Sequence, residues 1–217
     1  MIMKRILPCS LGLALGAGIL FAAQTGSAAS VEYYVDINTA SLVGNASGPF
    51  SLDFQLNDGS GTGDGNNTVT INNFAFGSGG AAGTANLSGG ASGDLASAVT
   101  LTDTSAFNEF YQTFNTGSTL SFDVTLTLNS DSGPTPDSFA VAILDNTLSN
   151  IPTSGVGDSY LLVNLGPTPG VVIGSSASPA VTLSATPVPE PGSLGWISMG
   201  LLAFGLHQWR RTFRQRS

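Results

Sequence analysis

The chain has 217 residues, of which 41% are hydrophobic and 9% are charged, and its formal net charge is −8. All six Lys and Arg residues lie before residue 6 or after residue 209. Of the fourteen Asp and Glu residues, all but Glu190 lie between residues 30 and 188, so this segment contains thirteen acids. That segment contains no Lys, Arg, His or Cys, so its formal charge is −13 and it offers no basic patch to nucleic acid. The same absences exclude a Ser-His-Asp triad, a thiol nucleophile and a Schiff-base lysine.

Residues 1–29 have the layout of a secretory signal peptide. Lys4 and Arg5 form a positive n-region, and an apolar stretch follows. The small residues Ala28 and Ala29 then offer a cleavage site. We therefore expect a signal helix that directs the chain into the Sec machinery and is then removed. An N-terminal membrane anchor is the alternative, but the short apolar core and the small residues at its end favour cleavage.

The exported domain is expected at residues 30–186, and about 155 residues suffice for one domain with a hydrophobic core. Three runs alternate apolar and polar side chains with a period of two, which predicts strands with one buried face. A fourth run is apolar at every position, which predicts a central strand covered on both faces. The alternating runs are 31–37, 50–56 and 120–128, and the apolar run is 139–144.

Weaker runs predict the remaining strands. In one of them the apolar residues change phase, which predicts a bulge near Asn72 and Asn73. Turn residues such as Gly and Pro separate the runs. About nine short strands with such turns predict an all-β fold, namely a jelly-roll-like antiparallel β-sandwich. The weaker runs are 68–76, 99–102, 160–165, 171–173 and 181–183.

The segment 107–114 supports two interpretations. Its four aromatic residues follow the spacing of one helical face. In a strand, Phe110 and Phe114 would lie on one face and Tyr111 on the other. The abundance of phenylalanine and the long strand that follows favour a strand, and in either case core packing is favoured over a ligand platform. The aromatic residues are Phe107, Phe110, Tyr111 and Phe114.

Two Gly-rich stretches, 58–67 and 77–93, follow predicted strands. The first carries Asp58, Asp64, Asn66 and Asn67, whose side-chain oxygens are ligands of the kind that Ca²⁺ takes. The spacing is not that of an EF-hand, and no Lys follows for a phosphate loop. We therefore expect either a Ca²⁺ site, with Asp58, Asp64 and Asn66 as its first candidate ligands, or a flexible connection in which Gly supplies positive φ, and no other cofactor.

Tyr34 is the tyrosine that the alternation places on a polar strand face, and it is the first candidate for contact with a sugar. The alternative is a partly covered surface tyrosine. Carboxylate pairs, as in glycosidases, are the only catalytic chemistry left, but no motif pairs any two acids, so we expect no enzyme. Three Asn-x-Ser/Thr triplets, at Asn45, Asn66 and Asn86, are acceptors for attached glycan, and chance also explains them in a chain of this composition.

Residues 187–217 contain three parts in order. The first is a motif that two prolines make rigid and extended. The second, 192–209, is an apolar run that would extend roughly 27 Å as a helix, enough to cross the core of a bilayer. The third is a basic end, which the positive-inside rule keeps in the cytoplasm. The motif is Val188, Pro189, Glu190 and Pro191, and the basic residues are Arg210, Arg211, Arg214 and Arg216.

The order Pro-Glu-Pro, apolar helix and arginine cluster resembles the PEP-CTERM sorting signal, and the resemblance covers residues 188–217. It implies a Gram-negative substrate of a membrane-embedded exosortase, which would cut near the motif while the inner membrane holds the chain. It also implies release to the cell surface or extracellular matrix and an association with extracellular polysaccharide. An ordinary C-terminal anchor with a proline-containing stalk is the alternative for the same residues.

The sequence therefore predicts a non-enzymatic, exported surface or extracellular-matrix protein that an exosortase sorts. The alternative is a carbohydrate- or Ca²⁺-binding β-sandwich module that acts in exopolysaccharide or envelope. A nucleic-acid partner is excluded, because a polyanion would be repelled by the acidic domain.

Overall fold

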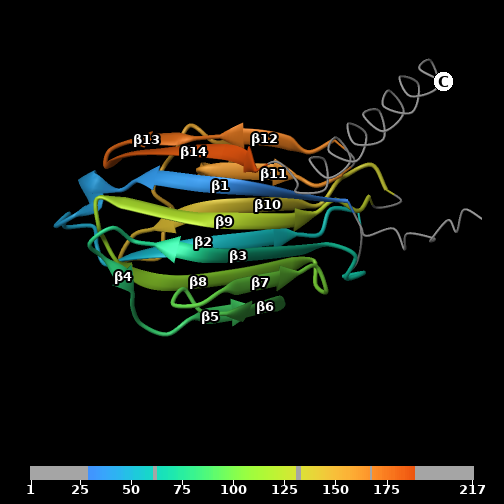
Figure 1. Ribbon diagram of the computed structural model, residues 1–217, viewed down its shortest axis with the longest axis horizontal. Helices are drawn as coiled ribbons and strands as arrows, with labels where there is room; N and C mark the ends of the chain where they lie inside the picture. Colours follow the sequence, from blue (N-terminus) through green and yellow to red (C-terminus); the bar gives the residue numbers. More distant parts are fainter. Residues whose placement is uncertain (1–28, 61–62, 131–132, 167, 189–217) are drawn as a thin grey trace, which may run out of the picture.

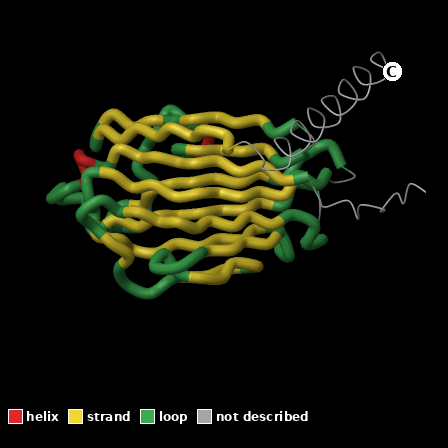
Figure 2. The backbone as a smooth tube through the Cα atoms, viewed as in Figure 1, coloured by secondary structure: helices red, strands yellow, loops and turns green. Residues whose placement is uncertain are grey.

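Two β-sheets pack face to face in the computed structural model of the chain, which describes residues 29–60, 63–130, 133–166 and 168–188 (Figures 1 and 2). The strand pairings in both sheets are antiparallel. The predicted all-β class and antiparallel sandwich are confirmed. The expected signal helix and transmembrane helix lie outside the described residues, and no helix within them is long and apolar enough to cross a membrane.

Each sheet has seven strands. Sheet A contains, in spatial order, β13 (Ser175–Ala177), β14 (Ala180–Val188), β1 (Ser30–Asn38), β9 (Thr119–Thr127), β3 (Thr68–Ala75), β7 (Val99–Thr102) and β6 (Gly90–Gly93). Sheet B contains β12 (Gly170–Ile173), β11 (Leu161–Asn164), β10 (Ser138–Leu144), β2 (Phe50–Asn57), β8 (Phe107–Asn115) and β4 (Gly80–Ala81), and β5 (Asn86–Ser88) also pairs with β8. Two short 3₁₀ helices, η1 (Ala40–Leu42) and η2 (Val156–Asp158), lie in connections.

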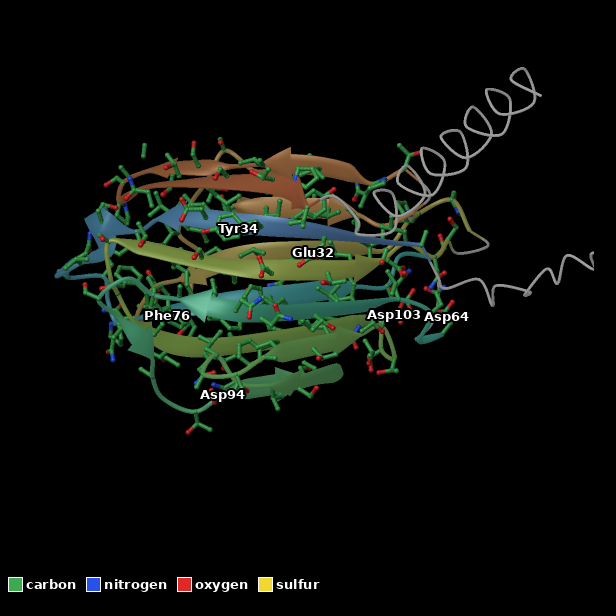
Figure 3. All side chains as sticks on the ribbon, in the orientation of Figure 1. Glu32, Tyr34, Asp64, Phe76, Asp94 and Asp103 are labelled. Atoms are coloured by element: carbon green, nitrogen blue, oxygen red, sulfur yellow. The ribbon has the colours of Figure 1, made fainter. Side chains whose placement is uncertain are left out.

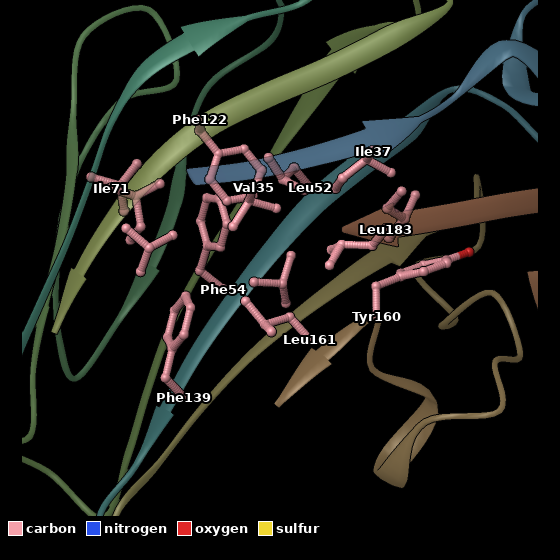
Figure 4. Close-up of a cluster of buried hydrophobic side chains, with 14 of the residues drawn as sticks. Val35, Ile37, Leu52, Phe54, Ile71, Phe122, Phe139, Tyr160, Leu161 and Leu183 are labelled. Carbon is pink, nitrogen blue, oxygen red and sulfur yellow. The ribbon is translucent and has the colours of Figure 1, made fainter. Parts of the chain in front are cut away.

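The inner faces of the two sheets form one hydrophobic core (Figure 4). Alternate residues of the long strands point inward, as the period-two pattern predicts, because successive side chains of a strand lie on opposite faces. The ring of Phe54, from β2, has its centroid 5.5 Å from that of Phe122 and 6.2 Å from that of Phe139. These aromatic side chains come from both sheets, so their burial holds the two layers together.

A bulge in β3 explains the change of phase in its sequence. The pairing of β3 with β9 shifts between Asn72 and Ala75, and Asn73 has a φ of 56°. Beyond the bulge, Phe74 packs against the core, with its ring centroid 5.6 Å from that of Phe122. The predicted bulge is confirmed, and its effect is to return an aromatic side chain to the inner face.

The segment 107–114 is a strand, β8, which decides between the two interpretations. Phe110, Gln112 and Phe114 are buried on one face, in the arrangement expected for a strand. Phe107, in contrast, is 42% exposed, so the expectation of core packing is wrong for this residue. Its position in the alternation places it on the outer face of β8, with Glu109 and Tyr111, so the opposite sheet does not cover it.

Three short strands, β4, β5 and β6, lie in the Gly-rich segment 77–93, for which the sequence predicts no strand. Their residues are mostly Gly, Ala, Ser and Asn, so no apolar alternation announces them. At Gly90 in β6, close approach to β7 requires glycine, because a Cβ there would lie 2.2 Å from the carbonyl oxygen of Thr102.

Two strands differ in extent or coverage from their predictions. β14 is longer than the run 181–183 and pairs with β1 up to Val188, so two residues assigned to the tail belong to sheet A. In β10, the last four residues are buried, whereas Ser138 and Ala140 are half-buried. The predicted coverage of both faces of β10 is therefore confirmed for its second half.

Candidate functional site

The loop 58–67 lies at one end of the sandwich and contains the residues predicted to bind Ca²⁺ (Figure 3). Asp58 Oδ2 accepts a hydrogen bond from Gly63 N at 2.5 Å. Asp64 accepts hydrogen bonds from the backbone N and the Nδ2 of Asn66, at 3.1 and 2.8 Å. The structure thus pairs Asp64 with Asn66 and ties Asp58 to the loop backbone. Within the described residues, no three Asp, Glu, His or Cys side chains are grouped so as to hold a metal ion.

Asn67 is fully buried and links this loop to other parts of the sandwich. Its Nδ2 donates to Asn129 O at 3.0 Å and to Asp137 Oδ2 at 2.7 Å. Its Oδ1 accepts from Thr127 Oγ1 at 3.1 Å and from Asn129 N at 2.9 Å. A buried amide with both ends satisfied fixes the position of the loop relative to β9 and β10.

Two buried carboxyl groups, those of Asp103 and Asp137, lie in contact with this network. Asp103 Oδ2 accepts from Asn67 N at 2.8 Å, and Asp137 Oδ1 accepts from Gly59 N at 2.8 Å. Asp103 Oδ1 is buried without a hydrogen-bond partner among the described residues. Burial raises the pKa of Asp103 to about 7, against the effect of the Asn67 hydrogen bond, and the nearby Asp137 and Asp64 carboxyls raise it further.

No local pattern in the sequence groups Asn67, Asp103 and Asp137 as one cluster. Each of them is adjacent in sequence to a strand: Asn67 precedes β3, Asp103 follows β7 and Asp137 precedes β10. A polar residue next to a strand end is the available signal. It indicates a cluster only when the order of the strands in the two sheets is known.

Tyr34 lies on the outer face of sheet A and is 46% exposed, as its position in the alternation predicts (Figure 3). Its cross-strand neighbours are Asp123 of β9 and Thr186 of β14. Asp123 accepts a hydrogen bond from Asn73 Nδ2 at 2.7 Å. Directly opposite side chains in a sheet interact, so the exposed ring lies between a carboxylate and a hydroxyl group that can form hydrogen bonds with the hydroxyls of a ligand.

Polar side chains continue across sheet A in rows. Beside the row that contains Tyr34, a second row crosses six strands from β6 to β14. Hydroxyls and a carboxylate predominate in it, and no cation lies anywhere in the described segment. Such a face suits a neutral hydroxylated polymer better than a polyanion. The second row is Ser92, Thr100, Thr70, Thr125, Glu32 and Val188.

Sheet B carries a buried acid on its outer side. The alternation in β2 places Asp53 on the solvent face, but this residue is 1% exposed, between Ala142 and Tyr111 on the neighbouring strands. Gln55 Nε2 donates to Asp53 Oδ2 at 2.7 Å, whereas Oδ1 has no partner in the described part of the chain. Burial raises the pKa of Asp53 to about 7, the Gln55 hydrogen bond opposes it, and Glu109 adds to it. A side chain so covered gives a substrate no access.

Few of the predicted targeting residues lie in the described part of the chain. Ala29 is exposed, and its carbonyl oxygen accepts from Leu128 N at 2.8 Å. Val188 ends β14 opposite Glu32 and is 36% exposed. The chain therefore enters and leaves the sandwich at neighbouring positions. The residues outside the described ranges are Ala28, Pro189, Glu190, Pro191, Arg210, Arg211, Arg214 and Arg216.

Comparison of the chain with protein-family models, with curated proteins and with solved structures found no match. Its possible chemistry therefore follows from its own residues. These offer acceptors in abundance, amide and hydroxyl donors, and no positive charge between residues 30 and 188. Such an arrangement can bind hydroxyl groups or cations, and it repels anions.

Proposed function

We propose that this chain is an exported surface or extracellular-matrix protein without enzymatic activity, and that residues 188–217 act as a PEP-CTERM-type sorting signal. The division of charge carries the proposal. All six basic residues lie in the two expected targeting segments, and every charged residue of the domain between them is an acid. The domain boundaries, the jelly-roll-like topology, the signal helix and the transmembrane helix of residues 192–209 are parts of this proposal.

The proposed route follows from the order of the segments. The Sec machinery exports the chain, and cleavage after Ala28 or Ala29 frees the domain. The apolar run then holds it in the inner membrane, with the arginines in the cytoplasm. An exosortase acts at the motif 188–191 and releases the sandwich to the surface or matrix. The pairing of β1 with β14 supports this route, because β1 begins and β14 ends at the same end of this antiparallel pair, next to the two expected targeting segments.

Cell fractionation tests this route directly. The native host is compared with strains that carry Pro189→Ala or Glu190→Ala. We expect wild-type protein at the cell surface or in the medium, and both variants in the inner membrane. Thr186→Ala, just before the motif, is the matched control and should fractionate as wild type. Equal distribution of wild type and both motif variants would contradict the proposal.

A second candidate function is favoured by the exposed Tyr34 between Asp123 and Thr186: a carbohydrate-binding module that acts in exopolysaccharide or envelope. An aromatic ring flanked by carboxylate and hydroxyl groups provides stacking area and hydrogen bonds for a neutral sugar. The −13 charge of the segment makes neutral polymers the appropriate class. A glycan array followed by affinity electrophoresis tests it. Tyr34→Ala should abolish retention and Tyr111→Ala should not, whereas equal retention of both would contradict it.

Calcium binding at the loop 58–67 remains part of this second candidate. The observation in its favour is that Asp58 Oδ1 and Asp103 Oδ1 are buried and have no partner in the described ranges. Divalent cations bind such oxygens and would offset the repulsion among the acids of this end. Thermal unfolding in about 1 mM Ca²⁺ tests it. A rise in Tm that Asp64→Asn removes supports a site, and an unchanged Tm in wild type contradicts it.

A further inference from the structure

The strands along one side of the sandwich carry no charged residue. Residues 159–188 contain no Asp, Glu, Lys, Arg or His. They form β11 and β12 of sheet B and β13 and β14 of sheet A, which lie together at the top of Figure 1. The thirteen acids between residues 30 and 188 therefore all belong to other parts of the domain.

β12 is an edge strand of sheet B with an exposed apolar surface. Val171, Val172 and Ile173 are consecutive and are 39%, 41% and 46% exposed. The edge strands β4, β6 and β13 differ, because they consist of Gly, Ala and Ser. An edge strand leaves alternate backbone N–H and C=O groups outside the sheet, and apolar side chains beside them make it a template for another strand.

Val156 of η2 extends this apolar surface and is 64% exposed. The acid nearest to it in sequence is Asp158 of the same short helix, whose Oδ1 accepts a hydrogen bond from Thr153 N at 3.0 Å. Its connection lies along the end of β12, because Ser154 N donates to Ser175 O at 2.9 Å and Gly174 N donates to Tyr160 O at 2.9 Å. We define the β12 patch as Val156, Val171, Val172 and Ile173. It contains four of the ten large apolar side chains that are exposed in the described residues.

We propose that the β12 patch pairs with the same patch of a second copy of this chain, with the two β12 strands antiparallel about a two-fold axis. Charge selects this partner. Two domains of −13 repel each other wherever their acids approach, and the uncharged side is where they approach least. A basic partner would instead be drawn to the acidic surfaces. An identical edge also supplies matching β-branched side chains and unpaired backbone groups.

The pairing is weak and depends on concentration. Four strand residues and Val156 provide less contact than the roughly 800 Å² per partner of a standard interface. Association therefore becomes appreciable where many copies are held close together. This inference goes beyond the proposed function and does not depend on it, because it concerns the sandwich itself in any location.

Sedimentation velocity of the full chain in detergent tests the pairing, with charge placed at Val172. In a two-fold antiparallel pair Val172 is close to its own copy, so Val172→Glu sets like charges opposite each other and should weaken dimerisation several-fold. Val172→Lys by itself should weaken dimerisation in the same way. An equimolar mixture of the two variants should restore the dimer, which no folding defect would do. Leu87→Glu, on the edge strand β5 and 52% exposed, is the matched control and should behave as wild type.

Cysteine crosslinking provides the second measurement, in a Cys9→Ser background that leaves no other thiol. Oxidation of Val172→Cys should yield a covalent dimer, and Leu87→Cys should remain monomeric under the same conditions. The proposal is overturned if wild type shows no concentration-dependent association. It is equally overturned if association persists unchanged in Val172→Glu, or if mixing the Glu and Lys variants fails to restore it.

Discussion

The polar end around Asn67 and the uncharged side formed by β11–β14 show two consequences of a domain that contains no cation. At the polar end, acids are stabilised by amide donors: Asp103 accepts from Asn67 N, and Asp137 accepts from Gly59 N and Asn67 Nδ2. Such donors come from loops, whose backbone N–H groups are not used in a sheet ladder. Along β11–β14 the ladder uses these groups, and no acid occurs. In the absence of Lys and Arg, the buried acids of the polar end are thus stabilised by amide donors.

Substitution of Asn67 should produce the largest effect. Asn67→Ala removes four hydrogen bonds, and it takes one partner from the buried Asp137 and others from the half-buried Thr127 and Asn129. We expect the free energy of unfolding to fall by about 3–5 kcal/mol, measured by urea denaturation. Asn164→Ala, an exposed amide on the uncharged side, should change it by less than about 0.5 kcal/mol. Similar losses for the two variants would remove the distinction between these regions.

Stability should fall as pH rises from about 4 to about 7. In the folded protein the pKa of Asp103 and of Asp53 is raised to about 7, whereas the unfolded chain has ordinary carboxyl values near 4. Between these values the folded state binds more protons than the unfolded state. The free energy of unfolding therefore decreases through this window, by at most about 1.4 kcal/mol per pH unit for each group, and levels off above it.

Substitution of each acid by its amide distinguishes the contributions of Asp103 and Asp53 to the pH dependence of stability. Asp103→Asn and Asp53→Asn resemble the protonated acids, so each should be more stable than wild type at pH 8, by about 1–2 kcal/mol, and each should flatten part of the pH dependence. Urea denaturation at pH 4.5 and pH 8 measures both effects. Glu32→Gln, on the outer face of sheet A, is the control and should alter neither. Stability that increases between pH 4.5 and pH 7 would contradict the assignment.

The smallest effect is expected at Tyr34. Its side chain is 46% exposed and lies outside the core, so Tyr34→Ala should change the free energy of unfolding by less than about 0.5 kcal/mol. Phe122→Ala, on the opposite face of sheet A, should cost about 3–5 kcal/mol. Thermal and urea unfolding of the two variants measure the difference between the faces. A large loss for Tyr34→Ala would mean that the ring is a structural element of the sheet.

The long strands were predictable because apolar and polar side chains alternate along their sequences. Leu120, Phe122 and Val124 share one buried face, and this requires no knowledge of the partner strands. Even the bulge after Asn72 was visible as a change of phase. In contrast, β4, β5 and β6 depend on backbone pairing of small residues, for which the sequence contains no periodic signal.

The exposure of a candidate site residue was predictable only where the alternation within a single strand determines it. The exposure of Tyr34 follows from the alternation in β1, and it is confirmed. The burial of Asp53 contradicts the same rule, because Tyr111 and Ala142 from neighbouring strands flank it and the register decides which side chains adjoin it. Asp103 and Asp137 are 34 residues apart and meet through the packing of β7 and β10, from different sheets. Such meetings depend on topology, which local sequence does not encode.

The intact mass of the mature protein from cells tests the account most directly. Wild type is compared with Pro189→Ala and Glu190→Ala. The account predicts a wild-type mass that lacks residues 1–28 or 1–29 and the C-terminal arginines, and variants that retain the C-terminal tail. A wild-type mass that still includes Trp209 and the residues after it would contradict sorting by cleavage. The sandwich would then act as a membrane-anchored domain, with its partners at the membrane.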